Sequence, residues 1–151
     1  MRGADRADER WAEGGRRQGM RTQERAAGDG AARILVVEDE ALVRTMVCEM
    51  LTDAGYDVQE AQSGDEADAL MSAGLRIDLL LTDIRMPGTL DGGDLIRRAT
   101  GRCPALKTVA MSGYAGAKYL CENVADRFIA KPFTSSVLQR EIAGVLRAGA
   151  G

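Results

Sequence analysis

Asp78-Leu-Leu-Leu-Thr-Asp83-Ile-Arg-Met-Pro87 is the most informative segment of this chain. Its leucine run is short and continuously apolar, which is typical of a strand buried on both faces of a parallel sheet. The run ends at Asp83, and Pro87 follows where it can extend neither a helix nor a sheet. Open α/β sheets bind ligands at the carboxyl ends of their strands, so Asp83 is a candidate site residue. A simple strand-ending turn is the alternative.

Apolar runs on either side of this segment alternate with segments of helical periodicity. Strands are expected at residues 34–37, 56–61, 78–82, 107–111 and 127–130. The helices between them are expected to start or stop at Gly55, Ser63, Gly74 and Thr134. Because parallel strands need long, right-handed crossover connections, this alternation predicts an α/β fold. Its five-stranded parallel sheet would carry five helices on its two faces.

Length and composition set the domain organisation. The chain has 151 residues and a formal net charge of −3. Residues 33–148 suit one domain with its own core, whereas residues 1–32 lack an apolar face and predict a disordered or loosely structured tail. The residues after the last predicted helix are too few for an output domain, which leads us to expect a single-domain protein.

The composition also excludes several functions. The small net charge gives no indication of direct nucleic-acid binding, and no apolar run reaches membrane-spanning length. Cys48, Cys103 and Cys121 lack metal-ligand spacing, so we interpret them as reduced thiols of a cytoplasmic protein. The chain contains no histidine, which excludes a histidine nucleophile, a histidine-rich metal site and a phosphohistidine relay within it.

Charged or hydroxyl side chains follow four of the predicted strands. These side chains are Glu38 and Asp39, Asp83, Ser112, and Lys131. In a doubly wound sheet these strand ends share one edge, so we expect the side chains to meet in one pocket. Crowded carboxylates repel one another, and a hard divalent cation such as Mg²⁺ would relieve this repulsion. A carboxylate nucleophile beside a metal, an ammonium and a hydroxyl donor indicates phosphoryl transfer.

Each of these residues also has a simpler interpretation. Glu38 and Asp39 could stabilise the positive N-terminal end of the following helix. Lys131 could merely neutralise nearby acids, and Ser112 could be a turn residue. The joint occurrence of all these residues at the strand ends is less probable by chance than that of any one of them, so we favour the phosphoryl-transfer pocket.

The segments ILVVEDE, LLLTDIRMPG, VAMSGYA and FIAKPF give the chain a family resemblance. In their order and spacing, the sequence resembles the receiver domain of two-component response regulators from about Arg33 to Arg147. The resemblance implies a flavodoxin-like fold with strand order 2-1-3-4-5.

The same resemblance assigns roles in the pocket. Asp83 would accept a phosphoryl group from a sensor histidine kinase or a histidine phosphotransfer protein. Asp39, Asp83 and the backbone carbonyl of Arg85 would bind Mg²⁺, and Glu38 would act through water. Lys131 would contact the phosphoryl group.

The resemblance further implies a conformational switch. Ser112 would move to hydrogen-bond the phosphoryl group, and Phe128 would rotate inward with it. The Lys131–Pro132 bond is typically cis in this family, a conformation that an X-Pro bond allows cheaply. Arg85 and Tyr114 stand at positions that control hydrolysis, and we expect these two large side chains to slow it.

Two features depart from the family pattern. The loop at 88–92 is one residue longer than the commonest form, and Gly93 replaces a larger apolar residue. We therefore expect an altered start to the third helix and an intact site.

The expected function is a phosphorylation-dependent switch whose fourth helix, fifth strand and fifth helix bind a protein partner or relay phosphate. Its only catalysis would be its own phosphorylation and dephosphorylation, and it would be a monomer or a phosphorylation-dependent dimer. Three alternatives remain open at this point. They are a receiver fragment of a larger regulator or hybrid kinase, a Mg²⁺-dependent aspartyl phosphatase or phosphotransferase, and a flavin or nucleotide binder.

Overall fold

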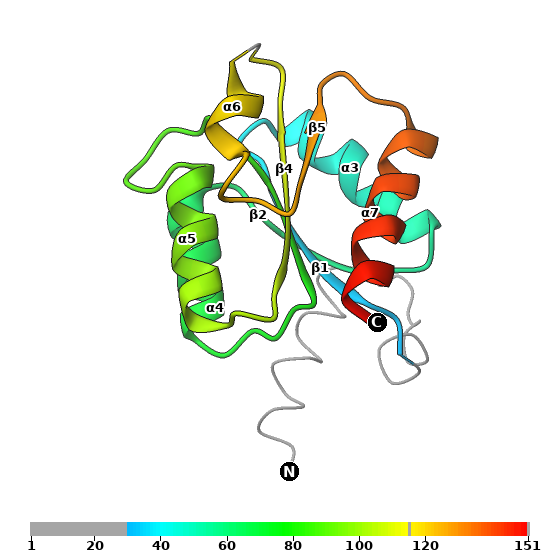
Figure 1. Ribbon diagram of the computed structural model, residues 1–151, viewed down its shortest axis with the longest axis horizontal. Helices are drawn as coiled ribbons and strands as arrows, with labels where there is room; N and C mark the ends of the chain where they lie inside the picture. The colour runs from blue at the N-terminus through cyan, green and yellow to red at the C-terminus, as the bar shows by residue number, and fades with distance from the viewer. Residues whose placement is uncertain (1–29, 115, 151) are drawn as a thin grey trace.

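The computed structural model describes residues 30–114 and 116–150, which form a five-stranded parallel sheet covered by helices (Figure 1). The strands are β1 (Arg33–Val37), β2 (Asp57–Ala61), β3 (Leu79–Asp83), β4 (Lys107–Ser112) and β5 (Arg127–Ala130). Their order is β2-β1-β3-β4-β5, which confirms the predicted flavodoxin-like fold. Most of the expected N-terminal tail, residues 1–29, lies outside the described residues.

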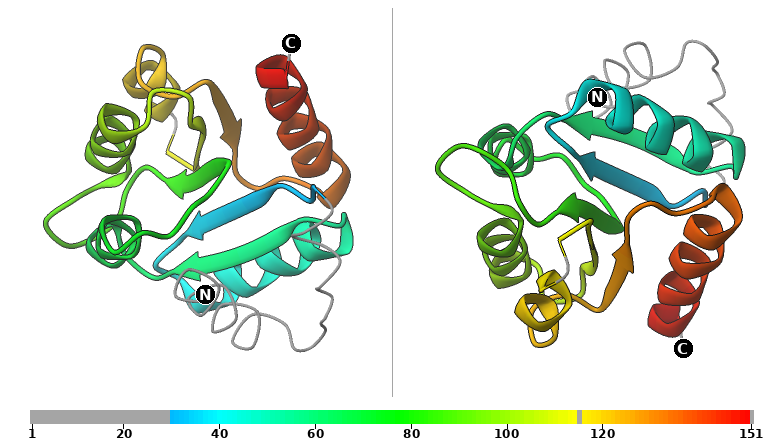
Figure 2. Two further views of the ribbon diagram at one scale, coloured as in Figure 1. Left: turned by 90° about the horizontal axis from the view of Figure 1, so that it is seen from below. Right: turned by 90° about the horizontal axis from the view of Figure 1, so that it is seen from above.

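The helices lie on both faces of the sheet (Figures 1 and 2). They are α3 (Ala41–Asp53), α4 (Gly64–Ser72), α5 (Gly92–Arg102), α6 (Ala117–Cys121) and α7 (Ser135–Ala150). The cap predicted at Ser63 is present, because its side chain accepts a hydrogen bond from the Glu66 amide. Helix α6, with 5 residues, is the shortest of these helices. Within the described residues, the structure contains no helix long and apolar enough to cross a bilayer.

Two apolar layers hold the sheet between the helices. Alternate residues of each strand point to opposite faces, so Leu35 and Leu80 pack toward α4 and α5, whereas Ile34 and Leu81 pack toward α3 and α7. Every residue of β3 is buried, as the leucine run predicted. Each leucine withdrawn from water contributes about 1.5–3 kcal/mol to folding, so this central strand anchors the sheet.

The apolar periodicity of α3 overstates its buried face. Val47 and Leu51 are buried in the core, but Leu42 and Met46 are 77% and 49% exposed. Leu42 and Met46 therefore belong to the outer surface of the helix and not to its packed face.

The register of the strands brings their carboxyl ends together. Val37 of β1 pairs with Thr82 of β3, and the residue that follows each of them is an acid, Glu38 and Asp83. On the other side of β3, Ser112 at the end of β4 pairs with Ala130, directly before Lys131. Residues far apart in the sequence thus meet at one edge of the sheet.

Candidate functional site

Three carboxylates gather at this edge. Glu38 is fully buried, Asp83 is 8% exposed, and Asp39 is exposed. Each offers one oxygen atom, and these three oxygens lie within 4.8 Å of one another. The structure thus brings together the three acids that the sequence placed at neighbouring strand ends.

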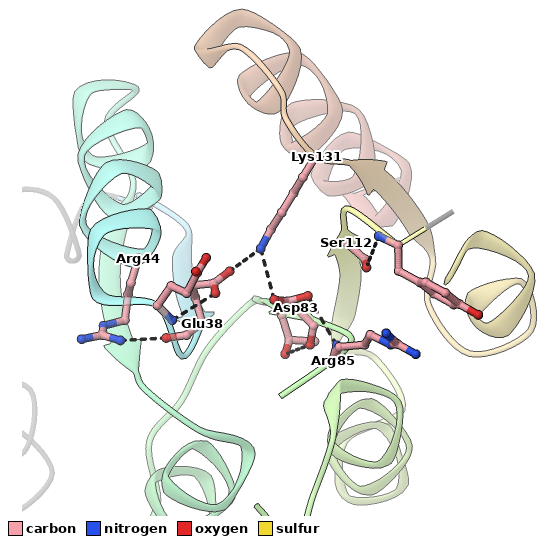
Figure 3. A network of polar contacts seen from close by, with 9 residues as sticks. Glu38, Arg44, Asp83, Arg85, Ser112 and Lys131 are labelled. Atoms are coloured by element: carbon pink, nitrogen blue, oxygen red, sulfur yellow. Dashed lines mark hydrogen bonds and ion pairs between the residues drawn. The ribbon is translucent and has the colours of Figure 1, made fainter. Parts of the chain in front are cut away.

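Lys131 joins two of these acids from the end of β5 (Figure 3). Its Nζ donates hydrogen bonds to Glu38 Oε1 at 2.7 Å and to Asp83 Oδ2 at 3.1 Å. The Lys131–Pro132 peptide bond is cis, as the family resemblance implied. The two hydrogen bonds of Nζ place the ammonium group directly beside the carboxylate predicted to accept a phosphoryl group.

Burial and charge act together on the ionisation of the pocket. Burial raises the pKa of the Glu38 carboxyl, and the hydrogen bond from Lys131 offsets only part of this rise. Burial alone would lower the pKa of Lys131, but its bonds to Glu38 and Asp83 outweigh burial and raise it. Lys131 consequently stays charged at neutral pH. When ionised, the three carboxylates and this ammonium leave two net negative charges, which suits a divalent cation.

The donor set suits Mg²⁺ in particular, because this ion prefers oxygen ligands and keeps several bound waters. Both carboxylate oxygens of Glu38 already accept hydrogen bonds, from Lys131 and from the Glu40 amide. The exposed Asp39 carboxylate accepts none from the described residues, so a hydrated ion could reach it. Asp39 is therefore the acid most open to the ion, whereas both oxygens of Asp83 also accept hydrogen bonds, from Lys131 at 3.1 Å and from the Arg85 amide at 3.4 Å.

A residue missed by the sequence reasoning fixes the backbone of Glu38. Arg44 Nη1 donates to the Glu38 carbonyl oxygen at 2.7 Å, and its Nε donates to Glu60 Oε1 at 2.9 Å. The Glu38 amide is held from the other side by the Ala61 carbonyl at 3.2 Å. Helical side chains lean toward the helix N-terminus, so an arginine four residues after Glu40 was the available signal.

The hydroxyl and aromatic residues lie on the opposite side of Asp83. Ser112 is buried, and its Oγ accepts a hydrogen bond from the Tyr114 amide at 3.0 Å. The Arg85 guanidinium stacks on the Tyr114 ring, 3.9 Å from its centroid, so these two predicted residues are in contact. Phe128 is partly buried against the apolar layer beneath α4 and α5. The switching role of Ser112 and Phe128 and the control of hydrolysis by Arg85 and Tyr114 stay predictions.

The start of α5 contacts the main chain beside Asp83. Asp91 caps the helix through a capping box with Asp94, and the Gly92 amide donates to the Ile84 carbonyl at 2.9 Å. A Cβ atom on Gly92 would lie 2.1 Å from the Asp83 carbonyl oxygen, whereas one on Gly93 would find its nearest neighbour at 3.5 Å. The sequence singled out Gly93 because a larger residue is usual there, and the structure has room for a Cβ atom at Gly93, whereas Gly92 requires glycine.

Comparison with known proteins agrees with this geometry. The family model of the response regulator receiver domain matches residues 34–143. Sensor kinase CckA of Brucella abortus is 36% identical over 121 residues, which cover 78% of this chain but only 13% of CckA. A chemotaxis protein CheY homolog of Campylobacter jejuni is 30% identical over 125 residues, covering 79% of this chain and 95% of the homolog. The crystal structure of response regulator TrrA from Thermotoga maritima, in complex with Mg²⁺-BeF, is 29% identical with a TM-score of 0.69. The aligned region covers 76% of this chain and 98% of TrrA. The chain therefore belongs to the response regulator receiver domain family.

Proposed function

We propose that this protein is a phosphorylation-dependent signalling switch and that Asp83 is its phosphoacceptor. The phosphoryl donor would be a phosphohistidine on a sensor histidine kinase or on a histidine phosphotransfer protein. The observation that carries the proposal is the setting of Asp83. Its Oδ2 lies 3.1 Å from the Lys131 ammonium, and its carboxylate shares the pocket with Glu38 and Asp39. Membership of the receiver family supports this reaction class.

The reaction needs little beyond positioning and charge neutralisation. One carboxylate oxygen of Asp83 forms a bond to phosphorus while the phosphorus–nitrogen bond of the donor breaks, and the imidazole keeps the bonding electrons. Lys131 would pair with a phosphoryl oxygen. Mg²⁺ held by Asp39, Asp83 and the Arg85 carbonyl, with Glu38 behind them, would neutralise charge on the phosphoryl oxygens. Transfer to Asp83 is then favoured by attraction on both sides of the phosphoryl group.

The switch would begin at Ser112. A phosphoryl group brings about −1.5 to −2 charges and strong acceptors, so the Ser112 hydroxyl, whose oxygen accepts from the Tyr114 amide, gains an acceptor for its own proton. If Ser112 moves toward Asp83, it vacates space on the side of β5, where Phe128 is only partly buried. The phosphoryl group then favours one of two pre-existing arrangements of α6, β5 and α7, and a protein partner reads the difference.

We infer that catalysis is limited to the protein's own phosphorylation and dephosphorylation. A phosphatase acting on other substrates would need a general acid close to the nucleophile. Arg85, two residues after Asp83, stacks on Tyr114 and cannot deliver a proton, and Lys131 and Glu38 are bound to each other at 2.7 Å. Because the proposed donors are kinases that use ATP, we also propose that the protein works in the cytoplasm.

Beryllium fluoride with Mg²⁺ tests the switch, because it occupies the place of a phosphoryl group on a carboxylate. We expect amide NMR shifts in ¹⁵N-labelled protein at Ser112, at Phe128 and along α6 when both reagents are added. Asp83→Asn removes the attachment point and should abolish these shifts. Changes confined to the acidic residues, or an equal response in the variant, would contradict the proposal.

A further inference from the structure

We propose that Arg44 is a positioning residue for the metal-binding carboxylates. The inference rests on the proposed function, since the ion concerned is the one that phosphoryl transfer would use. Arg44 lies in the first turn of α3, and its side chain is only 16% exposed. It donates one hydrogen bond to the main chain of Glu38 and one to the side chain of Glu60. Arg44 therefore connects α3 to β2 and to the acidic segment, residues 38–40.

The acidic segment needs this contact because it begins where the chain leaves the sheet. Strand β1 ends at Val37, and the Glu38 amide makes one more bond to the β2 side, to Ala61. The Glu38 carbonyl receives its hydrogen bond from Arg44 instead of from a neighbouring strand. Since the peptide group is planar, fixing this carbonyl also fixes the amide and the Cα atom of Asp39, from which the metal-binding side chain starts.

The geometry requires an arginine. A guanidinium group presents its donors in a rigid planar fork, so Nε can hold Glu60 while Nη1 holds the Glu38 carbonyl. A lysine at this position would keep the positive charge, but its single ammonium on a flexible stem lacks that fork. Charge and positioning can therefore be separated by one conservative substitution.

Two effects of removing Arg44 oppose each other. Loss of a positive charge near the acids would strengthen Mg²⁺ binding, whereas loss of orientation would weaken it. The charge effect should be small, because Glu60 already neutralises Arg44 at 2.9 Å and salt screens what remains. Hydrogen bonds that orient metal ligands commonly change metal affinity by about 10-fold to 100-fold. We therefore expect positioning to dominate.

Titration of ¹⁵N-labelled protein with MgCl₂, followed by NMR, measures the affinity directly. Arg44→Ala and Arg44→Lys should both raise the Mg²⁺ dissociation constant about 10-fold. The matched control is Arg98→Ala, which removes an exposed arginine from an ion pair with Asp68 between α5 and α4. Asp68 keeps its second partner, Arg102, so this variant should bind Mg²⁺ like the wild type. Titrations are run well below the melting temperature of every variant, so each reports the folded state.

Three results would overturn the inference. Wild-type or tighter affinity in Arg44→Ala shows that the contact does not orient the ligands, even if the melting temperature falls. Wild-type affinity in Arg44→Lys shows that the planar fork of the arginine is not needed to orient the ligands. A wild-type protein that does not bind Mg²⁺ removes the proposed function together with the inference. If the wild type binds Mg²⁺ and Asp83→Asn binds it more weakly, the proposed site stands whatever Arg44 shows.

Discussion

Replacing Gly92 by alanine tests the packing that holds the loop after Asp83. An added Cβ atom would lie 2.1 Å from the Asp83 carbonyl oxygen, 2.7 Å from the Ile84 Cα and 2.9 Å from the Asp83 carbonyl carbon. All three are main-chain atoms, so no side-chain rotation can relieve the overlap. The start of α5 and the end of β3 must instead move apart by about 1 Å to restore ordinary contact.

The expected cost follows from two opposing terms. Overpacking a well-packed site costs about 1–3 kcal/mol, and occasionally more. Contact with the main chain places Gly92→Ala at the upper end of that range. The substitution also restricts the unfolded chain, which returns about 0.4–1 kcal/mol. We therefore expect a net loss of about 2 kcal/mol in the free energy of unfolding.

Urea unfolding followed by far-UV circular dichroism measures this loss, and the same helix supplies two controls. A Cβ atom on Gly93 would meet only side-chain atoms at 3.5 Å or beyond, and one on Gly101 would meet nothing within 4 Å. Gly93→Ala and Gly101→Ala should be neutral or stabilise the protein by up to about 1 kcal/mol. Wild-type stability in Gly92→Ala, or an equal loss in Gly93→Ala, would refute the reasoning.

Two other predictions concern the pocket mouth and the thiols. Arg85→Asn combined with Tyr114→Glu removes the stacked pair and should speed loss of the phosphoryl group from Asp83 several-fold, because water gains access to it. An unchanged decay rate would show that these two side chains do not slow hydrolysis. Burial raises the pKa of Cys48 from 9.0 to about 12, so its thiolate fraction at pH 8 falls about 1000-fold. Iodoacetamide should therefore modify the exposed Cys103 well before Cys48 in the native protein, as peptide mass analysis would show; equal rates would contradict this burial.

Much of the fold could be predicted because its signals are local and periodic. The leucine run of β3 is short and apolar at successive positions, as expected of a strand covered on both faces. The meeting of Glu38, Asp83 and Lys131 also followed from the sequence, since parallel strands end at one edge of the sheet. The strand order itself came from the family resemblance and not from the alternation of elements.

The remaining features depend on contacts that leave no periodic trace. Arg44 binds a main-chain carbonyl, and its place four residues after Glu40 was the only sign of this contact in the sequence. Gly92 and Gly93 look alike in the sequence, and only the approach of α5 to Asp83 separates them. Leu42 fits the apolar spacing of α3 yet lies outside its buried face, because the periodicity of a helix does not report how wide its covered stripe is.

The phosphoacceptor role of Asp83 is the central claim, and the mass of the intact protein tests it most directly. The wild type and Asp83→Asn are incubated with a small-molecule phosphodonor, with and without Mg²⁺. We predict that the wild type gains one phosphoryl group only when Mg²⁺ is present, and that the variant gains none. Absence of any gain in the wild type, or an equal gain in Asp83→Asn, would contradict the account.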